Sequence, residues 1–178
     1  MNFSRYKKSN IDKIKELFAK VFTDSESESE GLIIKNFVDD LMTGTSSKDL
    51  YGFIATNQEN IIGSIFFSKI TFDSDVSAFI LSPVAIHTDY QKKGIGQQLI
   101  NFGIKYLKEN NVELILTYGD PEFYSKVGFS HITEKIIKAP LKLSYPEGWL
   151  AQSLVSDKVK PVEGNTYCVK ALDKPELW

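Results

Sequence analysis

The stretch from Leu81 to Ile100 constrains the fold of this chain more than any other part of it. Its apolar first half predicts a strand, and the residues from Gly96 onward predict a helix, with a short glycine-bearing loop between them. The first N–H groups of a helix have no intrahelical acceptor and lie at the positive end of the helix dipole. The sequence therefore predicts an anion-binding site where this helix begins.

The residues of this loop have the chemistry that a phosphate group requires. Gly94 and Gly96 have no side chain where a phosphate would approach the backbone, and Lys92 and Lys93 add mobile positive charge. The loop has neither the Gly-Lys-Ser/Thr ending of a triphosphate-binding loop nor the three glycines of a dinucleotide-binding loop. A tight strand-to-helix connection with solvated lysines is the alternative that the spacing leaves open.

Composition narrows the class of protein. A chain of 178 residues can bury a core as one domain, and a formal net charge of −2 argues against nucleic-acid partners and a polybasic membrane anchor. No apolar run approaches the roughly 20 residues of a membrane span, and no signal-peptide core follows the N-terminus. The single cysteine, Cys168, allows no internal disulfide, and with only two histidines a structural zinc site is not expected. We therefore expect a cytoplasmic protein that binds no metal.

Hydrophobic periodicity predicts a mixed α/β fold, with a single domain over residues 1–178. Helices are expected at residues 11–22, 31–42, 96–109 and 121–127. Strands are expected at residues 2–7, 50–56, 61–72, 76–86, 112–118, 131–138 and 149–155. Short turns make the second, third and fourth strands an antiparallel meander, whereas the helix after the glycine loop makes the fourth and fifth strands parallel. Residues 23–30 are rich in serine and glutamate and predict a solvated loop, with an acidic rim that attracts cations as the alternative.

Pro83 is an anomaly in the predicted fourth strand, because proline has no N–H to donate to a neighbouring strand. A bulge or a local parting of the strands at Ser82-Pro83 would resolve the conflict and leave nearby backbone groups unpaired. A fourth strand that is simply shorter than predicted is the alternative.

The glycine-bearing loop resembles the acyl-CoA pyrophosphate loop of the GNAT superfamily of N-acetyltransferases. That loop has the pattern Gln/Arg-x-x-Gly-x-Gly/Ala, and residues 91–96 (Gln-Lys-Lys-Gly-Ile-Gly) match it in full. The resemblance implies a central mixed sheet of about six or seven strands, splayed fourth and fifth strands, and helices on both faces. Residues of about 50–138 would form the cofactor-binding core, and residues of about 1–49 and 139–178 would form the acceptor side.

The resemblance also implies acetyl-CoA as co-substrate, with its pantetheine arm in the gap between the splayed strands. The arm would pair with the backbone of the fourth strand, and an N–H at or next to the bulge would face the thioester carbonyl as an oxyanion donor. The cofactor-binding residues expected from the resemblance are Val84, Ala85, Ile86, Gln91, Lys92, Lys93, Gly94, Ile95, Gly96, Gln97 and Lys126.

A second motif lies downstream, in residues 119–129 (Gly-Asp-Pro-Glu-Phe-Tyr-Ser-Lys-Val-Gly-Phe). The residues alone predict a proline-started helical turn that Gly128 ends, with aromatic side chains available for the core. The pattern Phe-Tyr-x-Lys/Arg-x-Gly-Phe resembles the GNAT element in which a tyrosine hydroxyl faces the CoA sulfur as general acid. This resemblance gives Tyr124 the role of general acid and lets Lys126 reach a CoA phosphate. Core packing of the ring and solvent exposure of the lysine are the alternatives.

The reaction that the resemblance implies is transfer of an acetyl group from acetyl-CoA to a primary amine. We expect direct attack without an acyl-enzyme, because Cys168 lies outside both motifs. A phenol with an ordinary pKa of about 10 can protonate a leaving thiolate. The residues considered as a base for the amine, none of them compelling, are Asp75, His87, Asp120 and Glu122.

The identity of the acceptor is open at the level of sequence. A small-molecule amine is favoured, a protein amine is the second choice, and a homodimer is compatible with the sequence. The alternative function is a non-catalytic acyl-CoA-binding sensor or scaffold. A binding module would not need a hydroxyl at position 124, so Tyr124 favours the enzyme.

Overall fold

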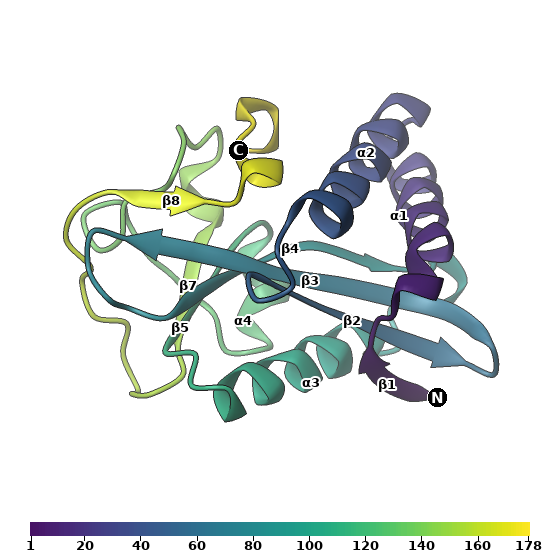
Figure 1. Ribbon diagram of the computed structural model, residues 1–178, viewed down its shortest axis with the longest axis horizontal. Coiled ribbons are helices and arrows are strands. Elements are labelled where there is room, and N and C mark those ends of the chain that lie inside the picture. Colours follow the sequence, from purple (N-terminus) through teal and green to yellow (C-terminus); the bar gives the residue numbers. More distant parts are fainter. The chain divides into compact units, whose positions relative to one another are not determined.

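The computed structural model describes residues 1–178 (Figure 1). The chain divides into two compact units, each made of two stretches: residues 1–66 with 83–103, and residues 67–82 with 104–178. β3 (Asn60–Phe72), β4 (Ala78–Ile86) and α3 (Ile95–Glu109) contribute residues to both units. A single domain over the whole chain stays a prediction.

The fold is a mixed α/β fold with eight strands, one more than the upper end of the expected range. They are hydrogen-bonded in the order β1-β2-β3-β4-β5-β7-β6, and β8 pairs with β3. The remaining strands are β1 (Asn2–Arg5), β2 (Leu50–Asn57), β5 (Leu114–Tyr118), β6 (Ser130–His131), β7 (Trp149–Ser153) and β8 (Thr166–Cys168). The remaining α-helices are α1 (Ile11–Ser25), α2 (Glu28–Gly44) and α4 (Pro121–Ser125), and the 3-10 helices are η1 (Lys8–Asn10), η2 (Thr88–Tyr90), η3 (Pro146–Gly148), η4 (Lys170–Leu172) and η5 (Pro175–Leu177).

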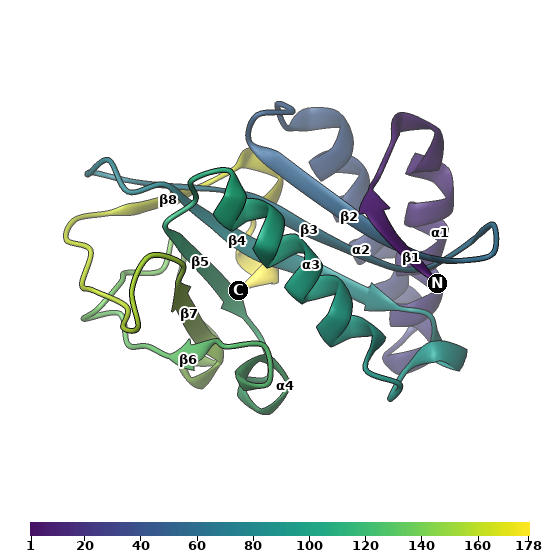
Figure 2. The same ribbon diagram turned by 90° about the horizontal axis from the view of Figure 1, so that it is seen from below.

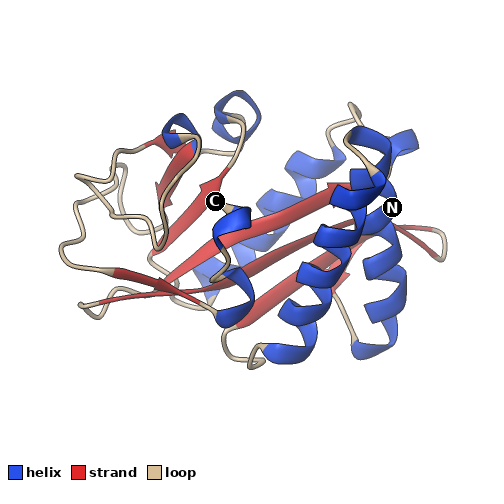
Figure 3. Cartoon of the chain, turned by 90° about the horizontal axis from the view of Figure 1, so that it is seen from above, coloured by secondary structure: helices blue, strands red, loops and turns tan.

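In the first unit, helices cover both faces of the strands. α1 and α2 lie in front of the strands in Figure 3, and α3 lies in front of them in Figure 2. Phe18 of α1 packs against Phe66 of β3 (ring centroids 6.1 Å apart), and Phe102 of α3 packs against Phe53 of β2 (5.7 Å). Successive residues of a strand point to opposite faces, so the apolar strands β2 and β3 supply a core on each side.

In the second unit, β5 and β7 form the centre of the core. β5 pairs antiparallel with β7 along its whole length, from Leu114↔Ser153 to Tyr118↔Trp149. Trp149 is fully buried, and its Nε1 donates to the carbonyl oxygen of Ile137 (2.8 Å). The apolar run predicted as the fifth strand is therefore buried between neighbouring strands, which explains why it lacks alternation.

The parallel pairing of β4 with β5 ends before β4 does. It runs from Ala78↔Leu114 to Leu81↔Thr117, and β5 ends one residue later at Tyr118. β4 continues through Pro83 to Ile86. Pro83 therefore stands beyond the last paired residue, where a missing N–H removes no bond to β5. The predicted parting of the strands at this proline is confirmed.

The predicted loop at residues 23–30 is wrong for most of its length. α1 continues to Ser25, and α2 already begins at Glu28. Ser27 is the N-cap of α2, since its Oγ accepts from the N–H of Glu30 (3.2 Å), and acidic residues in the first turn suit the helix dipole. The serine and glutamate residues that indicated a solvated loop are thus also the residues that start a helix.

Two features near the C-terminus also differ from the expectation. The strand predicted at residues 131–138 is limited to Ser130–His131, and the chain then turns, with the N–H of Ile136 bonded to the carbonyl of Thr133. The unpredicted strand β8 pairs antiparallel with residues 70–72 of β3. Three residues are too few for hydrophobic periodicity to indicate a strand.

No helix of this chain is both long enough and apolar enough to span a membrane.

Candidate functional site

The glycine-bearing loop lies in the first unit and is held against the end of β4. The side-chain Nε2 of Gln91 donates to the carbonyl oxygen of Ile86 (3.0 Å), and the N–H of Gln91 is bonded to Thr88. His87 caps η2, since its Nδ1 accepts from the N–H of Asp89 (3.3 Å). Gln91, expected to bind cofactor, therefore has a structural bond that fixes where the loop begins.

The loop presents a run of N–H groups without protein acceptors. The first helical bond of α3 is made by the N–H of Gln98, which donates to the carbonyl of Gly94 (3.1 Å). From Lys92 to Gln97, no N–H has a backbone or side-chain partner. Lys92 and Gly94 have positive φ (+59° and +75°), a conformation that helps consecutive N–H groups converge as an anion-binding nest. The arrangement suits a multiply charged anion at the positive end of α3.

The two lysines of the loop differ in their surroundings. Lys93 folds back onto its own turn: its Nζ donates to the carbonyl of Asp89 (2.9 Å) and lies 5.4 Å from the centre of the Tyr90 ring. Lys92 is exposed and has no such partner. Of the two predicted positive charges, Lys92 is therefore the one free to move toward a bound anion.

The second half of β4 lies in the same unit as the loop. The N–H of His87, just after the strand, donates to the carbonyl of Ile62 (2.8 Å), and the Ile86 side chain packs against Gly63. Ala85 is buried, whereas Val84 and Ile86 are half-buried. The first unit thus brings together all of the predicted cofactor-binding residues except Lys126.

The second motif lies in the second unit and forms α4. Asp120 caps this helix, since its Oδ1 accepts from the N–H of Glu122 (2.9 Å). The backbone of Tyr124 is held on both sides: its N–H donates to Asp120, and its carbonyl accepts from Phe129 (3.2 Å). Lys126 is exposed and ends the helix, and only its backbone has a bond there.

The ring of Tyr124 occupies a fitted position. It packs edge-on against Phe123 (ring centroids 5.0 Å apart) and Phe129 (5.7 Å). A Cβ at Gly119 would lie 2.8 Å from Cε2 of Tyr124, and a Cβ at Gly148 would lie 2.9 Å from the carbonyl oxygen of Gly119. Gly119 therefore makes room for this ring, and a larger residue there would displace it, whereas Gly148 lets the chain pass close to the backbone of Gly119.

Thr117, a residue that the sequence analysis did not single out, affects the pKa of Tyr124. Thr117 is fully buried, and its Oγ1 donates to the carbonyl of Leu81 (2.9 Å) at the last paired position of β4 and β5. Burial raises the pKa of Tyr124, while the nearby hydroxyl of Thr117 lowers it and the carboxylate of Asp120 raises it. The only sequence signal for Thr117 was a hydroxyl in an otherwise apolar strand.

The candidate bases have structural bonds or exposed positions. Asp120 caps α4, His87 caps η2, and Glu122 is exposed. Burial and the carboxylate of Asp173 raise the pKa of Cys168 to about 11, so its thiol is protonated at neutral pH and is a poor nucleophile. The chain has no group of three or more side chains that could hold a metal ion.

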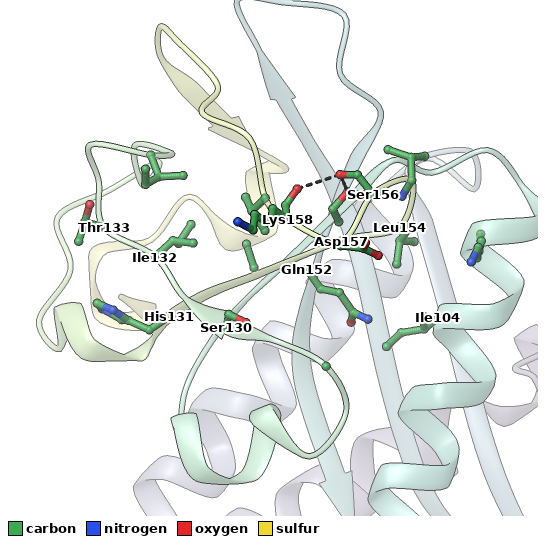
Figure 4. Close-up of a pocket in the computed structure, with 17 residues that line it drawn as sticks. Ile104, Ser130, His131, Ile132, Thr133, Gln152, Leu154, Ser156, Asp157 and Lys158 are labelled. Atoms are coloured by element: carbon green, nitrogen blue, oxygen red, sulfur yellow. Dashed lines mark hydrogen bonds between the residues drawn. The ribbon is translucent and has the colours of Figure 1, made fainter.

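A cavity of about 940 Å³ lies elsewhere in the second unit, lined by residues of α3, β6, β7 and the loop after β7 (Figure 4). None of the predicted site residues lines it. Gln152 on its wall lies against Gly128, where a Cβ would be 2.6 Å from Nε2 of Gln152. The cavity is therefore separate from Tyr124, although Gly128, which ends the helical turn of the second motif, lines it.

Comparison with known proteins relates both motifs to one family. Residues 48–131, which contain the loop and Tyr124, match the sequence profile of the acetyltransferase (GNAT) domain. Over 155 residues, the chain is 25% identical to the uncharacterized N-acetyltransferase YjhQ of Escherichia coli K12, spanning 84% of this chain and 82% of that protein.

Two solved structures share the fold over almost the whole chain. The GNAT N-acetyltransferase YhbS of Escherichia coli, in complex with CoA, has a TM-score of 0.80 at 22% identity, covering 97% of this chain and 92% of YhbS. A GNAT acetyltransferase of Brucella melitensis, in complex with acetyl-CoA, has a TM-score of 0.73 at 19% identity and covers 97% of each chain. Residues 48–131 thus match a GNAT acetyltransferase domain, and the chain shares its fold with solved GNAT acetyltransferases.

Proposed function

We propose that this protein transfers an acetyl group from acetyl-CoA to a primary amine by direct attack of the amine on the thioester. The observation that carries the proposal is the run of unpartnered N–H groups from Lys92 to Gln97 where α3 begins. A pyrophosphate is the kind of anion that such a run binds, and CoA contains one. The CoA and acetyl-CoA bound by the two structural neighbours support this choice of ligand.

The first unit would hold the cofactor through its backbone. The N–H groups of residues 92–97 would bind the pyrophosphate, and Lys92 would add a mobile charge. The backbone of Val84, Ala85 and Ile86 would pair with the pantetheine arm as an added strand does. Pro83 has no N–H, so the N–H of Val84 is the donor we assign to the developing oxyanion. A contact of Lys126 with a CoA phosphate stays a prediction.

Tyr124 would act as the general acid that protonates the departing CoA thiolate. Burial raises its pKa, so the phenol keeps its proton at neutral pH and has it available for transfer. A free thiol has an ordinary pKa of about 8.5, which is below that of the phenol. Exclusion of water raises the pKa of the thiol as well, and this narrows the difference between the pKa values of the two groups. Removal of the amine's proton is assigned to water, because Asp120 and His87 are held by their capping bonds.

A small cationic amine is the acceptor that we propose. The junction of α1 and α2 is acidic: Glu26 lies between the helices, Glu28 and Glu30 lie in the first turn of α2, and all three are exposed. Asp24 is less available, because its Oδ2 accepts from Lys20 (2.8 Å) and Thr88 (2.7 Å), bonds that lower its pKa. Attraction by the exposed carboxylates would weaken with added salt.

The test is release of free thiol from acetyl-CoA in the presence of a panel of amines, with calorimetry of CoA binding alongside. The proposal expects binding of CoA and turnover with at least one small amine. Absence of any binding heat would refute the cofactor assignment. Firm binding without turnover on any small or protein amine would instead support the non-catalytic sensor.

A further inference from the structure

The cavity of about 940 Å³ in the second unit has an apolar interior (Figure 4). Its buried lining residues include Ile132, Ala151 and Leu154, and the half-buried Ile104 of α3 adds a fourth apolar side chain. Sites for small organic molecules typically have volumes of about 300–1,000 Å³ and a mostly apolar lining with a few polar groups. The size and the interior of this cavity therefore suit one small organic molecule.

Gln152 of β7 is a polar lining residue whose hydrogen bonding is incomplete. Its Oε1 is buried and has no hydrogen-bond partner, which costs free energy. Ser153 and Ser156, which also line the cavity, bond to each other instead (Oγ to Oγ, 3.0 Å). The torsion of a terminal amide has broad minima, so the oxygen of Gln152 can turn toward the cavity when a ligand offers an N–H group. Gln152 thus favours a ligand with a hydrogen-bond donor.

The edge of the cavity carries more positive than negative charge. Lys108, Asp157 and Lys158 line it and are exposed, and none of the three has an ion-pair partner. Two lysines against one aspartate leave one unit of positive charge, and a proton on His131, which also lines the cavity, would add to it. A ligand with one carboxylate matches this charge, whereas a cationic amine would be repelled.

We propose that this cavity binds a small organic acid that combines an apolar ring, one N–H donor and one carboxylate. The ring would lie against Ile104 and Leu154, and the N–H would donate to Oε1 of Gln152. The carboxylate would face Lys108 or Lys158 at the edge. None of the residues assigned to the cofactor or to the general acid lines this cavity, so the inference does not rest on the proposed function.

The first test compares three probes that differ in one feature at a time. Calorimetry of the cofactor-free protein uses indole-3-acetate, N-methylindole-3-acetate, which lacks the N–H donor, and indole-3-acetamide, which lacks the charge. Indole-3-acetate should bind with a Kd below about 1 mM. Loss of the donor should weaken binding about fivefold, because Oε1 of Gln152 then stays unpaired. Loss of the charge should weaken binding about threefold, as expected for an exposed ion pair.

Variants then connect each feature of the probe to a residue. Gln152→Leu removes the amide, so this protein should bind the two acetate probes with similar affinity. Lys108→Met combined with Lys158→Met should bind indole-3-acetate and indole-3-acetamide similarly and should keep the preference for the N–H. The matched control is Lys105→Met, because Lys105 is an exposed lysine of α3 that does not line the cavity. The control should bind all three probes as wild type does.

The position of bound indole-3-acetate is read from amide chemical shifts in ¹H–¹⁵N NMR spectra, where the signals of Ile104, Gln152 and Leu154 should move. Shifts confined to residues outside the cavity, or a Kd above about 1 mM for indole-3-acetate, would overturn the site. Equal affinities of wild type for the three probes would overturn the assignment of the donor and the charge. If Gln152→Leu does not fold, the comparison of the two acetate probes on wild type still decides whether the N–H contributes.

Discussion

Tyr124 combines a half-buried side chain with the hydroxyl that we assign as the general acid, which makes it the residue whose replacement is most informative. Tyr124→Phe keeps the ring between Phe123 and Phe129 and removes only the hydroxyl. Loss of general acid catalysis typically lowers turnover by about 10²–10⁴-fold, so we expect kcat to fall by about 10² or more. The Kd for acetyl-CoA, measured by calorimetry, should change less than about twofold.

The control for this variant is Tyr167→Phe. Tyr167 is an exposed residue of β8 whose hydroxyl donates to Asp73. Removal of this hydroxyl should leave kcat as in wild type. A Tyr124→Phe protein with wild-type kcat would show that the hydroxyl does not take part in the reaction.

Replacement of Gly94 tests the anion site, and it should change the Kd for CoA more than kcat. Its φ of +75° disfavours any side chain, although the space around it is open, with only the Gln98 side chain within 4 Å. Gly94→Glu places a carboxylate among the free N–H groups, where it would repel and replace a phosphate. We expect binding of CoA to weaken by about 10²-fold or more, a loss of roughly 3 kcal/mol.

Two comparisons separate charge from strain at this position. Gly94→Ala introduces the strain without the charge and should weaken binding less than Gly94→Glu does. Gly44→Ala, at a glycine with no atom within 4 Å of the added Cβ, should bind CoA as wild type does. Equal affinity of Gly94→Glu and wild type would remove the loop from the cofactor site.

At the scale of elements, the loop and the first turn of α3 make a prediction for hydrogen exchange. Amides without acceptors exchange rapidly, and the N–H groups from Lys92 to Gln97 have none in the free protein. If a pyrophosphate binds them, their exchange should slow by about tenfold or more at saturating CoA. Protection should be absent with pantetheine alone, which lacks the pyrophosphate. Protection confined to other segments would place CoA elsewhere on the protein.

The elements that the sequence predicted well are those with long periodic patterns or strong end signals. α1, α3, β2 and β3 fall within a few residues of their expected bounds, because their apolar faces repeat over several turns or pairs. The junction at residues 23–30 was wrong, because serine and glutamate suit both solvated loops and helix starts. β8 was missed, because its three residues are too few to show a hydrophobic period.

The candidate site likewise contains residues that a local sequence pattern predicts and residues that only packing brings together. The glycine loop and Tyr124 were predicted from short motifs whose residues are neighbours in sequence. Thr117, Gly119 and Gly148 act only through contacts that folding creates, such as the approach of Gly148 to the carbonyl of Gly119. The capping roles of His87 and Asp120 likewise depend on backbone geometry. A sequence alone does not show this geometry, so at that level both residues are candidate bases.

At the scale of the whole molecule, the shifted pKa values predict how stability depends on pH. Burial raises the pKa of Tyr6, of Tyr124 and, to about 11, of Cys168. Each of these groups holds its proton more tightly in the folded state, so the free energy of unfolding falls as pH rises through the interval between the unfolded and folded pKa values. Asp24 has a lowered pKa, so its contribution is lost at the acid end, as pH falls below about 4.

Cys168 makes the alkaline part of this dependence testable, since its pKa rises from 9.0 to about 11 on folding. The unfolded thiol ionises from about pH 9 upward while the folded thiol does not, and this difference draws the chain toward the unfolded state. Urea unfolding at pH 7, 9, 10 and 11 should therefore show a steady loss of stability above pH 9. Cys168→Ser removes this ionisation, so its loss between pH 9 and 10 should be smaller than that of wild type, with the remainder above pH 10 due to the tyrosines. Parallel pH profiles of the two proteins would mean that the thiol ionises equally easily in both states, and that burial does not shift it.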